Sequence, residues 1–454
     1  MSVKKITYLK NIASKAIAVS CFTNRGPVHI NFPFRKPFEP DTFTDNISPG
    51  IESLLNKTFY LHQKLKSITK LPEDKRLFHL ANKFSRLKKG LIIVGPENYG
   101  NDFYLQVNKL SKLLGYPLLA DGTSQLRYKK LLRNKLICNY EAMFRSQEFI
   151  NKYAPEVIIH FGRTPTSKGI DDFYESNSPL KIIVNQDGDV FDPSRKGIVY
   201  KYSPAVFCRS ICEFLPDLLK IQDTTWTEIY NEADNYLELL KGYLLSASTS
   251  LSEPGLVNDF LREVPENSTI MLSNSLPVRD FDFFASRYPK NLTIFQNRGA
   301  SGIDGIISTA LGIASVKKNP VYLITGDIAF YYDINALLIA KKYEIPLNVI
   351  LINNNGGGIF NSLPIARYKN FIDEYFITSH NLDFKKLTEA FGVKCYSVRN
   401  LPDFLRCLKT LSHENKTVVI EIKTDSYKSL KLRKRYWEEC QSLLKKLVES
   451  HLPK

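Results

Sequence analysis

The sequence lacks long apolar runs and lacks clusters of cysteine or histidine. No uninterrupted apolar stretch in its 454 residues approaches the roughly 20 residues that span a bilayer. Its seven cysteines are scattered, and the one close pair, Cys208 and Cys212, has helical spacing with no second pair to complete a zinc site. The seven histidines are equally dispersed. We therefore expect free buried thiols, and we expect neither a membrane span nor a metal cluster.

The charge of the chain is strongly positive but is not concentrated in a binding motif. The formal net charge is +16, and its densest patch is "KSLKLRKRYW", residues 428–437. This patch leads into an amphipathic C-terminal stretch, and no nucleic-acid motif accompanies it, so we interpret it as a solvated helix face and expect no nucleic acid. The N-terminus faintly resembles an export signal, but Lys15 breaks its apolar part and no cleavage pattern follows. We expect a helix there, and a cytoplasmic protein.

Alternating strand-like and helix-like segments predict an α/β protein with parallel sheets. A middle domain is expected over residues 76–220, a helical linker over 221–255 with a boundary at "SEPG", and a second α/β domain over 256–454. Residues 1–40 contain one helix-like segment and one strand, "GPVHINFPF", which are too few elements for a domain, and 41–75 is interpreted as a linker. The expected strands of the two domains lie within residues 90–97, 116–121, 155–162, 180–189, 268–275, 292–297, 321–327, 347–354 and 417–423.

Two neighbouring strands of the second domain end in oxygen-bearing side chains. "VYLITGD" ends at Gly326 and Asp327, and "LNVILINN" leads into "NNNGGGIF". A right-handed strand–helix–strand unit places the carboxyl ends of both strands at one edge, where ligands bind in open parallel sheets. A carboxylate and an amide oxygen suit Mg²⁺, and glycines let backbone N–H groups approach a phosphate. The spacing predicts a metal–diphosphate site, although strand-end aspartates and glycine-rich turns are also common without any ligand.

The motif resembles that of thiamine-diphosphate enzymes, because an Asn pair follows Asp327 of "GD" by 27 residues. Within that class the chain is similar to the menaquinone-pathway synthase family of 2-succinyl-5-enolpyruvyl-6-hydroxy-3-cyclohexene-1-carboxylate (SEPHCHC). The stretches that carry the resemblance span nearly the whole chain: "GPVHINFPFRKPFEP", "FGRTPTSK", "DGDVFDPSRK", "SNSLPVRD", "NRGASGIDGIISTALG" and "GDIAFYYDINALLIAKKYEIPLNVILINNNGGGIFNSLP".

The resemblance implies a thiamine-diphosphate-enzyme fold with two complete domains, a middle domain and a diphosphate-binding domain, plus a remnant of an N-terminal pyrimidine-binding domain in residues 1–40. It implies that Asp327 and Asn354 bind Mg²⁺ or Mn²⁺ through their side chains and Gly356 through its carbonyl. For the apolar residues among the remaining cofactor contacts, ordinary core packing is the alternative interpretation. Those remaining contacts are Ile303, Gly326, Ile328, Gly357, Ile359 and Phe360.

The family resemblance also implies the reaction, a transferase step of menaquinone biosynthesis. 2-Oxoglutarate is decarboxylated on the cofactor, and the succinyl-semialdehyde carbanion is added to isochorismate. Both substrates are polyanionic, so cationic side chains are expected to pair with their carboxylates. The family positions for substrate binding correspond here to Arg279, Arg298, Lys168 and Ser275. A related synthase acting on pyruvate is the alternative within enzymes, and the two arginines argue against it.

The sequence departs from the family pattern at the activating glutamate of the pyrimidine-binding domain, to which no residue of this chain can be matched. Family enzymes form homodimers or homotetramers with sites shared between subunits. Three interpretations follow. The working enzyme includes an upstream or separately encoded N-terminal piece, the chain is an inactive remnant with residual cofactor binding, or it is a basic interaction protein that reuses the fold.

Overall fold

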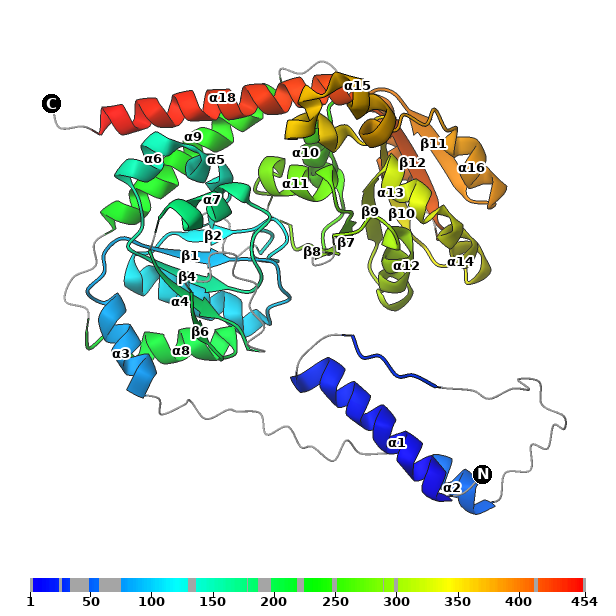
Figure 1. The fold of residues 1–454 in the computed structure, drawn as a ribbon, viewed down its shortest axis with the longest axis horizontal. Helices are drawn as coiled ribbons and strands as arrows, with labels where there is room; N and C mark the ends of the chain where they lie inside the picture. The colour runs from blue at the N-terminus through cyan, green and yellow to red at the C-terminus, as the bar shows by residue number, and fades with distance from the viewer. Residues whose placement is uncertain are drawn as a thin grey trace.

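The structure is a computed structural model that describes residues 3–23, 27–32, 49–56, 75–129, 136–177, 179–186, 197–218, 224–246, 251–288, 290–297, 301–411 and 415–451. Two α/β domains lie next to each other, each built on a six-stranded parallel sheet flanked by helices (Figure 1). This confirms the predicted fold class. We call residues 75–218 the first domain and residues 251–423 the second domain.

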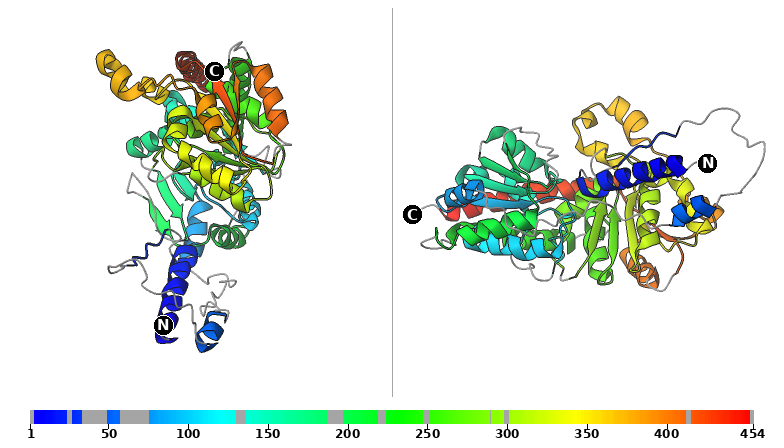
Figure 2. Two further views of the ribbon diagram at one scale, coloured as in Figure 1. Left: turned by 90° about the vertical axis from the view of Figure 1, so that its right-hand side faces the viewer. Right: turned by 90° about the horizontal axis from the view of Figure 1, so that it is seen from below.

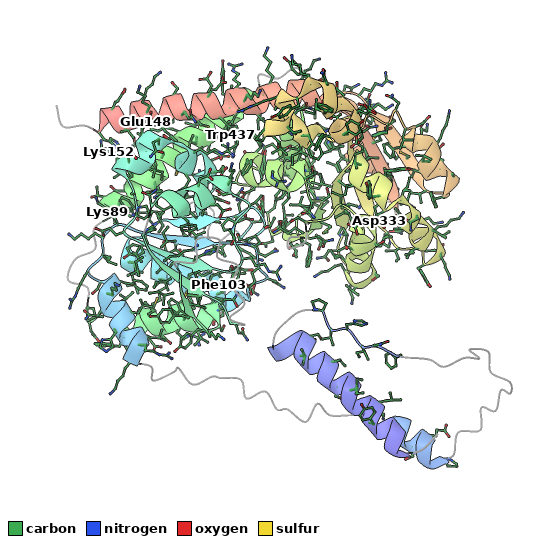
Figure 3. All side chains as sticks on the ribbon, in the orientation of Figure 1. Lys89, Phe103, Glu148, Lys152, Asp333 and Trp437 are labelled. Atoms are coloured by element: carbon green, nitrogen blue, oxygen red, sulfur yellow. The ribbon has the colours of Figure 1, made fainter. Side chains whose placement is uncertain are left out.

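The first domain has the strand order β3-β2-β1-β4-β5-β6. Its central strands β1 and β4 are buried at every residue, as expected for apolar strands covered by helices on both faces. Phe103 of α4 packs in the core on one face of the sheet (Figure 3). The elements are α3 (Lys75–Phe84), β1 (Gly90–Val94), α4 (Asn101–Leu114), β2 (Leu118–Ala120), β3 (Leu136–Ile137), α5 (Tyr140–Arg145), α6 (Gln147–Lys152), β4 (Val157–Phe161), α7 (Lys168–Ser176), β5 (Leu180–Val184), β6 (Ile198–Tyr200) and α8 (Pro204–Phe214).

The second domain has the strand order β11-β12-β10-β9-β7-β8. From β7 the chain passes to β8 on one side and then to β9 on the other, so the topological switch point lies between β7 and β9. The elements are α10 (Glu253–Glu263), β7 (Thr269–Leu272), α11 (Leu276–Phe284), β8 (Thr293–Gln296), α12 (Ile306–Val316), β9 (Val321–Gly326), α13 (Asp327–Tyr332), η3 (Ile334–Ala336), α14 (Leu337–Lys342), β10 (Asn348–Asn353), η4 (Gly358–Ser362), η5 (Pro364–Arg367), α15 (Lys369–Ile372), η6 (Asp373–Ile377), α16 (Phe384–Ala390), β11 (Lys394–Val398), α17 (Leu401–Leu411) and β12 (Val418–Lys423).

Two long helices connect the domains. α9 (Thr225–Ser246) packs on the first domain, and α18 (Ser426–Ser450) starts beside the second domain and runs back along the first (Figures 1 and 2). One face of α18 is buried: Tyr436, Cys440, Leu444 and Leu447 join a core that includes residues of β1 and β4. The interpretation of "KSLKLRKRYW" as a solvated face is therefore wrong for part of this stretch, because helical periodicity turns Arg433 and Tyr436 inward.

The N-terminal segment stands apart from both sheets (Figures 1 and 2). It contains α1 (Val3–Ala18), η1 (Val19–Thr23) and α2 (Pro49–Asn56). The expected helix is present, but residues 27–32 of the expected strand "GPVHINFPF" are not a strand, because none of the described strands pairs with them. Most of the expected linker 41–75 lies outside the described residues. No helix in the described ranges has the length and apolarity needed to cross a membrane.

Candidate functional site

A cavity of about 170 Å³ opens in the second domain at the carboxyl ends of β7, β9 and β10, beside the switch point. Every residue predicted to contact the cofactor lines it, together with one predicted substrate residue. These residues are Ser275, Ile303, Gly326, Asp327, Ile328, Asn354, Gly356, Gly357, Ile359 and Phe360.

Asp327 joins the end of β9 to the loop after β10. Its carboxylate is 2% exposed, and Oδ2 accepts hydrogen bonds from the backbone N–H groups of Asn354 at 3.1 Å and Gly356 at 2.9 Å. Oδ1 accepts a hydrogen bond from the N–H of Ile328 at 2.7 Å. The structure thus brings together the three residues predicted to bind the metal ion.

The Asn354 side chain is held in one orientation by a buried carboxylate. Its Nδ2 donates to Oε1 of Glu253 at 2.8 Å. Its Oδ1 is buried and has no hydrogen-bond partner among the described residues. Buried polar atoms nearly always have a partner, so an unpaired amide oxygen on a residue that lines a cavity indicates a ligand. An amide oxygen beside the carboxylate of Asp327 is a donor set that fits Mg²⁺ or Mn²⁺.

The glycines after Asn355 are required by the packing of the chain on itself. Gly356 has φ = 139°, and a Cβ there would lie 2.3 Å from the carbonyl oxygen of Ile377. A Cβ on Gly357 would lie 2.6 Å from the carbonyl oxygen of Phe376. The loop can therefore lie against residues 376–377 only if both positions lack a side chain.

The N–H groups of this loop are engaged within the chain, contrary to the prediction that they face a phosphate. Gly356 N–H donates to Asp327, Gly357 N–H to the carbonyl of Ile377 at 2.7 Å, and Gly358 N–H to the carbonyl of Gly356 at 2.9 Å. At Gly326, by contrast, a Cβ would meet nothing within 4 Å, so the space there belongs to the cavity.

Ser275 sits in strained backbone at the junction of β7 and α11. Its φ of 72° and ψ of −131° are rarely adopted by residues other than glycine, and such strain concentrates at functional sites. One turn along α11, Nη1 of Arg279 donates to the Ser275 carbonyl at 2.6 Å. Arg279 is half-buried but does not line the cavity. Arg298 lies outside the described residues.

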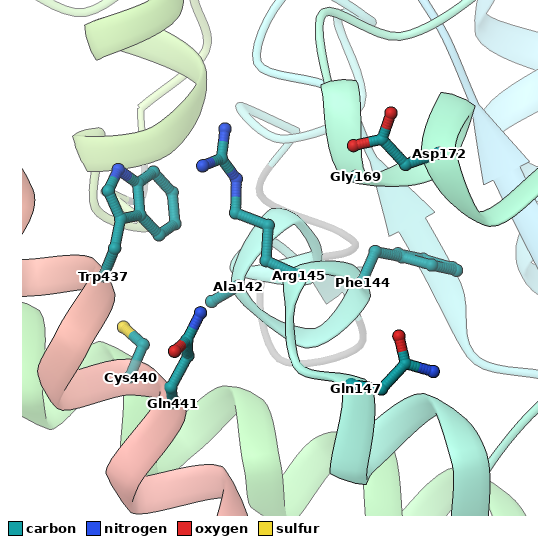
Figure 4. Close-up of a pocket in the computed structure, with 9 residues that line it drawn as sticks. All are labelled: Ala142, Phe144, Arg145, Gln147, Gly169, Asp172, Trp437, Cys440 and Gln441. Carbon is teal, nitrogen blue, oxygen red and sulfur yellow. The ribbon is translucent and has the colours of Figure 1, made fainter. Parts of the chain in front are cut away.

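Lys168 is not brought to this cavity. It is exposed at the start of α7, and the next residue, Gly169, lines a different cavity of about 260 Å³ between the first domain and α18. In that second cavity the guanidinium of Arg145 lies 4.5 Å from the ring of Trp437 (Figure 4). The structure therefore places the predicted lysine on another surface from the predicted metal site.

The sequence did not predict a buried charge cluster at the 170 Å³ cavity, which Glu253 and Asp280 help to line. Arg433 of α18 donates through Nε to Asp280 at 2.8 Å and through Nη2 to Oε2 of Glu253 at 2.6 Å. Burial raises the pKa of Glu253, and Arg433 opposes that shift. Burial alone would lower the pKa of Arg433, but Asp280 and Glu253 raise it. All three residues are at most 9% exposed, so the cluster is largely shielded from solvent.

His380 is a second residue that sequence reasoning missed. Its Nε2 lies 3.2 Å from Oδ2 of Asp327, without the geometry of a hydrogen bond. Its Nδ1 accepts a hydrogen bond from the N–H of Leu382 at 3.0 Å.

Comparison with known proteins agrees with this geometry. Residues 281–422 match the family described as "Thiamine pyrophosphate enzyme, C-terminal TPP binding domain". Similar curated proteins are each named 2-succinyl-5-enolpyruvyl-6-hydroxy-3-cyclohexene-1-carboxylate synthase. The protein of Listeria monocytogenes serotype 4b is 31% identical to this chain, and the match covers 98% of this chain and 75% of that protein. The protein of Bacillus cytotoxicus is 31% identical, with coverages of 97% and 74%, and that of Geobacillus kaustophilus is 30% identical, with coverages of 98% and 75%.

Proposed function

The chain belongs to the SEPHCHC synthase family of thiamine-diphosphate enzymes, and on that premise we propose that it decarboxylates 2-oxoglutarate and transfers the resulting four-carbon unit to isochorismate, a step of menaquinone biosynthesis. The observation that carries the proposal is the pairing of Asp327 with Asn354 at one cavity. The unpaired Oδ1 of Asn354 adds the oxygen ligand that a divalent cation needs there.

In this proposal the chain's residues hold and orient the cofactor. The Asp327 carboxylate and the Asn354 amide oxygen bind Mg²⁺ or Mn²⁺, and the Gly356 carbonyl completes the protein ligands. Ile303 and Phe360 give the same cavity apolar walls. Thiamine diphosphate bound there supplies the electron sink for decarboxylation.

The polyanionic substrates require cations, and Arg279 is the described residue best placed to meet them. It is anchored to the backbone of Ser275, which lines the cavity, so its guanidinium is held beside the site. A planar guanidinium pairs with a carboxylate through two parallel hydrogen bonds. Arg298 is proposed for the same task from its family position. We propose Lys168 as a further cation only on that basis, because the structure places it elsewhere.

Calorimetric titration of the chain with thiamine diphosphate, with and without Mg²⁺, tests the cofactor site. We expect Mg²⁺-dependent binding that Asp327→Ala abolishes, because the variant removes the only carboxylate among the predicted metal ligands. Asp403→Ala, whose side chain on α17 is 42% exposed and lies away from the cavity, serves as the matched control and should bind like wild type. Equal affinity of Asp327→Ala and wild type would refute the metal assignment.

Product analysis by mass spectrometry tests the substrates. Incubation with 2-oxoglutarate and isochorismate should yield the coupled product, and Arg279→Ala should raise the concentration of dicarboxylate needed. If pyruvate replaced 2-oxoglutarate with equal efficiency, the substrate assignment would fail while the cofactor assignment would stand.

A further inference from the structure

We propose that Glu253 and Arg433 are positioning residues that fix the orientation of the Asn354 amide, so that its oxygen and not its nitrogen faces the metal ion. The inference rests on the proposed function and names the groups that make the metal site competent. Both residues lie far from Asn354 in sequence, at the start of α10 and within α18.

The two ends of an asparagine amide are nearly identical in shape, so packing alone does not decide which end enters the cavity. Hydrogen bonding decides it here. Oε1 of Glu253 accepts from Nδ2 of Asn354 at 2.8 Å, and a carboxylate can only accept. A flipped amide would place Oδ1 against the carboxylate and two N–H donors against the cation. The observed orientation is the one that leaves Oδ1 for a metal ion.

Arg433 fixes the carboxylate that performs this selection. It bridges Oε2 of Glu253 and both oxygens of Asp280, so Glu253 cannot rotate away from Asn354 without losing a buried ion pair. Two further groups hold the same residue. The Thr424 hydroxyl donates to Oε1 at 3.3 Å, and the Glu253 backbone N–H donates to the hydroxyl of Ser429 at 3.2 Å.

Ser429 and Arg433 both belong to α18, as do the side chains that this helix buries on the first domain. The C-terminal helix therefore reaches the proposed metal site through a relay from Arg433 to Glu253 to the Asn354 amide. Hydrogen-bonded groups behind metal ligands typically change metal affinity about 10- to 100-fold when they are altered.

The isosteric variant Glu253→Gln gives a directional test. Because Arg433 only donates, it draws the new amide's oxygen toward itself and turns the new NH₂ group toward Asn354. Asn354 must then accept through Oδ1, which leaves its own NH₂ facing the cation. We expect the Mg²⁺ concentration that half-saturates thiamine-diphosphate binding, measured by calorimetry, to rise about 10- to 100-fold.

A second substitution should reverse this loss. Asn354→Asp in the Glu253→Gln background supplies a carboxylate that accepts from the new NH₂ group with one oxygen and offers the other to Mg²⁺, so affinity should return toward wild type. The same Asn354→Asp change alone sets two carboxylates against each other and should weaken Mg²⁺ binding. The midpoint of thermal unfolding without ligands reports the folding of each variant, and Arg435→Gln, exposed on α18, is the control.

The outcomes separate the two proposals. Unchanged Mg²⁺ dependence in Glu253→Gln, or a loss that Asn354→Asp fails to reverse, overturns the positioning role while the cofactor site stands. If wild type binds no thiamine diphosphate with Mg²⁺, the proposed function fails and the inference fails with it. Should Glu253→Gln not fold, Arg433→Lys replaces it, because one ammonium cannot pair with Glu253 and Asp280 in the same geometry. Reduced Mg²⁺ affinity is then expected, and unchanged affinity overturns the inference.

Discussion

Gly358→Ala should weaken metal binding by displacing one side chain. A Cβ at this position would lie 2.8 Å from Nδ2 of Asn354 and 3.4 Å from its Cγ. Ordinary contact begins near 3.4 Å, so the amide must withdraw by about 0.6 Å. Its hydrogen bond to Glu253 is 2.8 Å long, and a shift of this size takes it toward the limit of hydrogen-bond distance. The loss is on the order of 1.5–3 kcal/mol, because the acceptor is charged.

The assay compares two quantities in the same variant. Calorimetry with thiamine diphosphate should show a Mg²⁺ requirement raised by roughly tenfold or more, which corresponds to about 1.4 kcal/mol. In urea unfolding without ligands, the free energy of unfolding should fall by no more than the roughly 1.5–3 kcal/mol estimated for the lost hydrogen bond. Gly242→Ala is the matched control, because a Cβ there meets nothing within 4 Å and alanine favours the α9 helix. Wild-type Mg²⁺ dependence in Gly358→Ala would refute the reasoning.

Two further predictions concern strain and buried charge. Ser275→Gly should raise the free energy of unfolding by about 1 kcal/mol in urea titration, because glycine relieves the strain at φ = 72°. If the Ser275 hydroxyl contacts substrate, the same variant should lower kcat/KM. Ser315→Gly, within α12, serves as a control and should lower the free energy of unfolding. Burial, followed by the charge of Asp121, raises the pKa of Asp282 from 3.8 to about 7. The folded state thus prefers the neutral form of Asp282. The contribution of Asp282 to the free energy of unfolding is therefore full below about pH 4 and is lost as the pH rises through 7. In urea titrations, the free energy of unfolding should fall by on the order of 3 kcal/mol more from pH 5 to pH 8 in wild type than in Asp282→Asn. Equal pH dependence in the two proteins would contradict the assignment.

Every strand that sequence reasoning missed lies at the edge of a sheet, whereas β8 is the one edge strand among those that it found. Apolar runs such as "GLIIV" and "NVILI" form central strands that are buried on both faces, so hydrophobicity alone reveals them. The missed strands β3, β6 and β11 are all at sheet edges. β6 has no buried residue, β11 buries only two of its five residues, and β3 has only two residues. Edge strands need less apolar surface and leave a weaker signal.

The candidate site likewise contains residues that a local sequence pattern reveals and residues that it does not. Asp327 and Asn354 could be predicted because each follows an apolar run, and because parallel strands bring their carboxyl ends together. Glu253 could not, since its partners lie 101 and 180 residues away and no local pattern connects them. "SEPG" was interpreted as a domain boundary, although Ser252 caps α10 and Pro254 lies in its first turn, which is a signature of a helix start.

The buried charges around the cavity support the proposal of a divalent cation there. Glu253, Asp280 and Asp327 are carboxylates, and Arg433 is the cation that pairs with two of them. These described groups leave two negative charges in a region shielded from water, where unpaired charge is costly. The divalent cation proposed for this site offsets that charge more fully than an Arg or Lys would, and the diphosphate of the proposed cofactor would add further negative charge for the cation to bind. Under the proposed function, the cluster on α10, α11 and α18 orients the metal ligand and also favours a divalent cation.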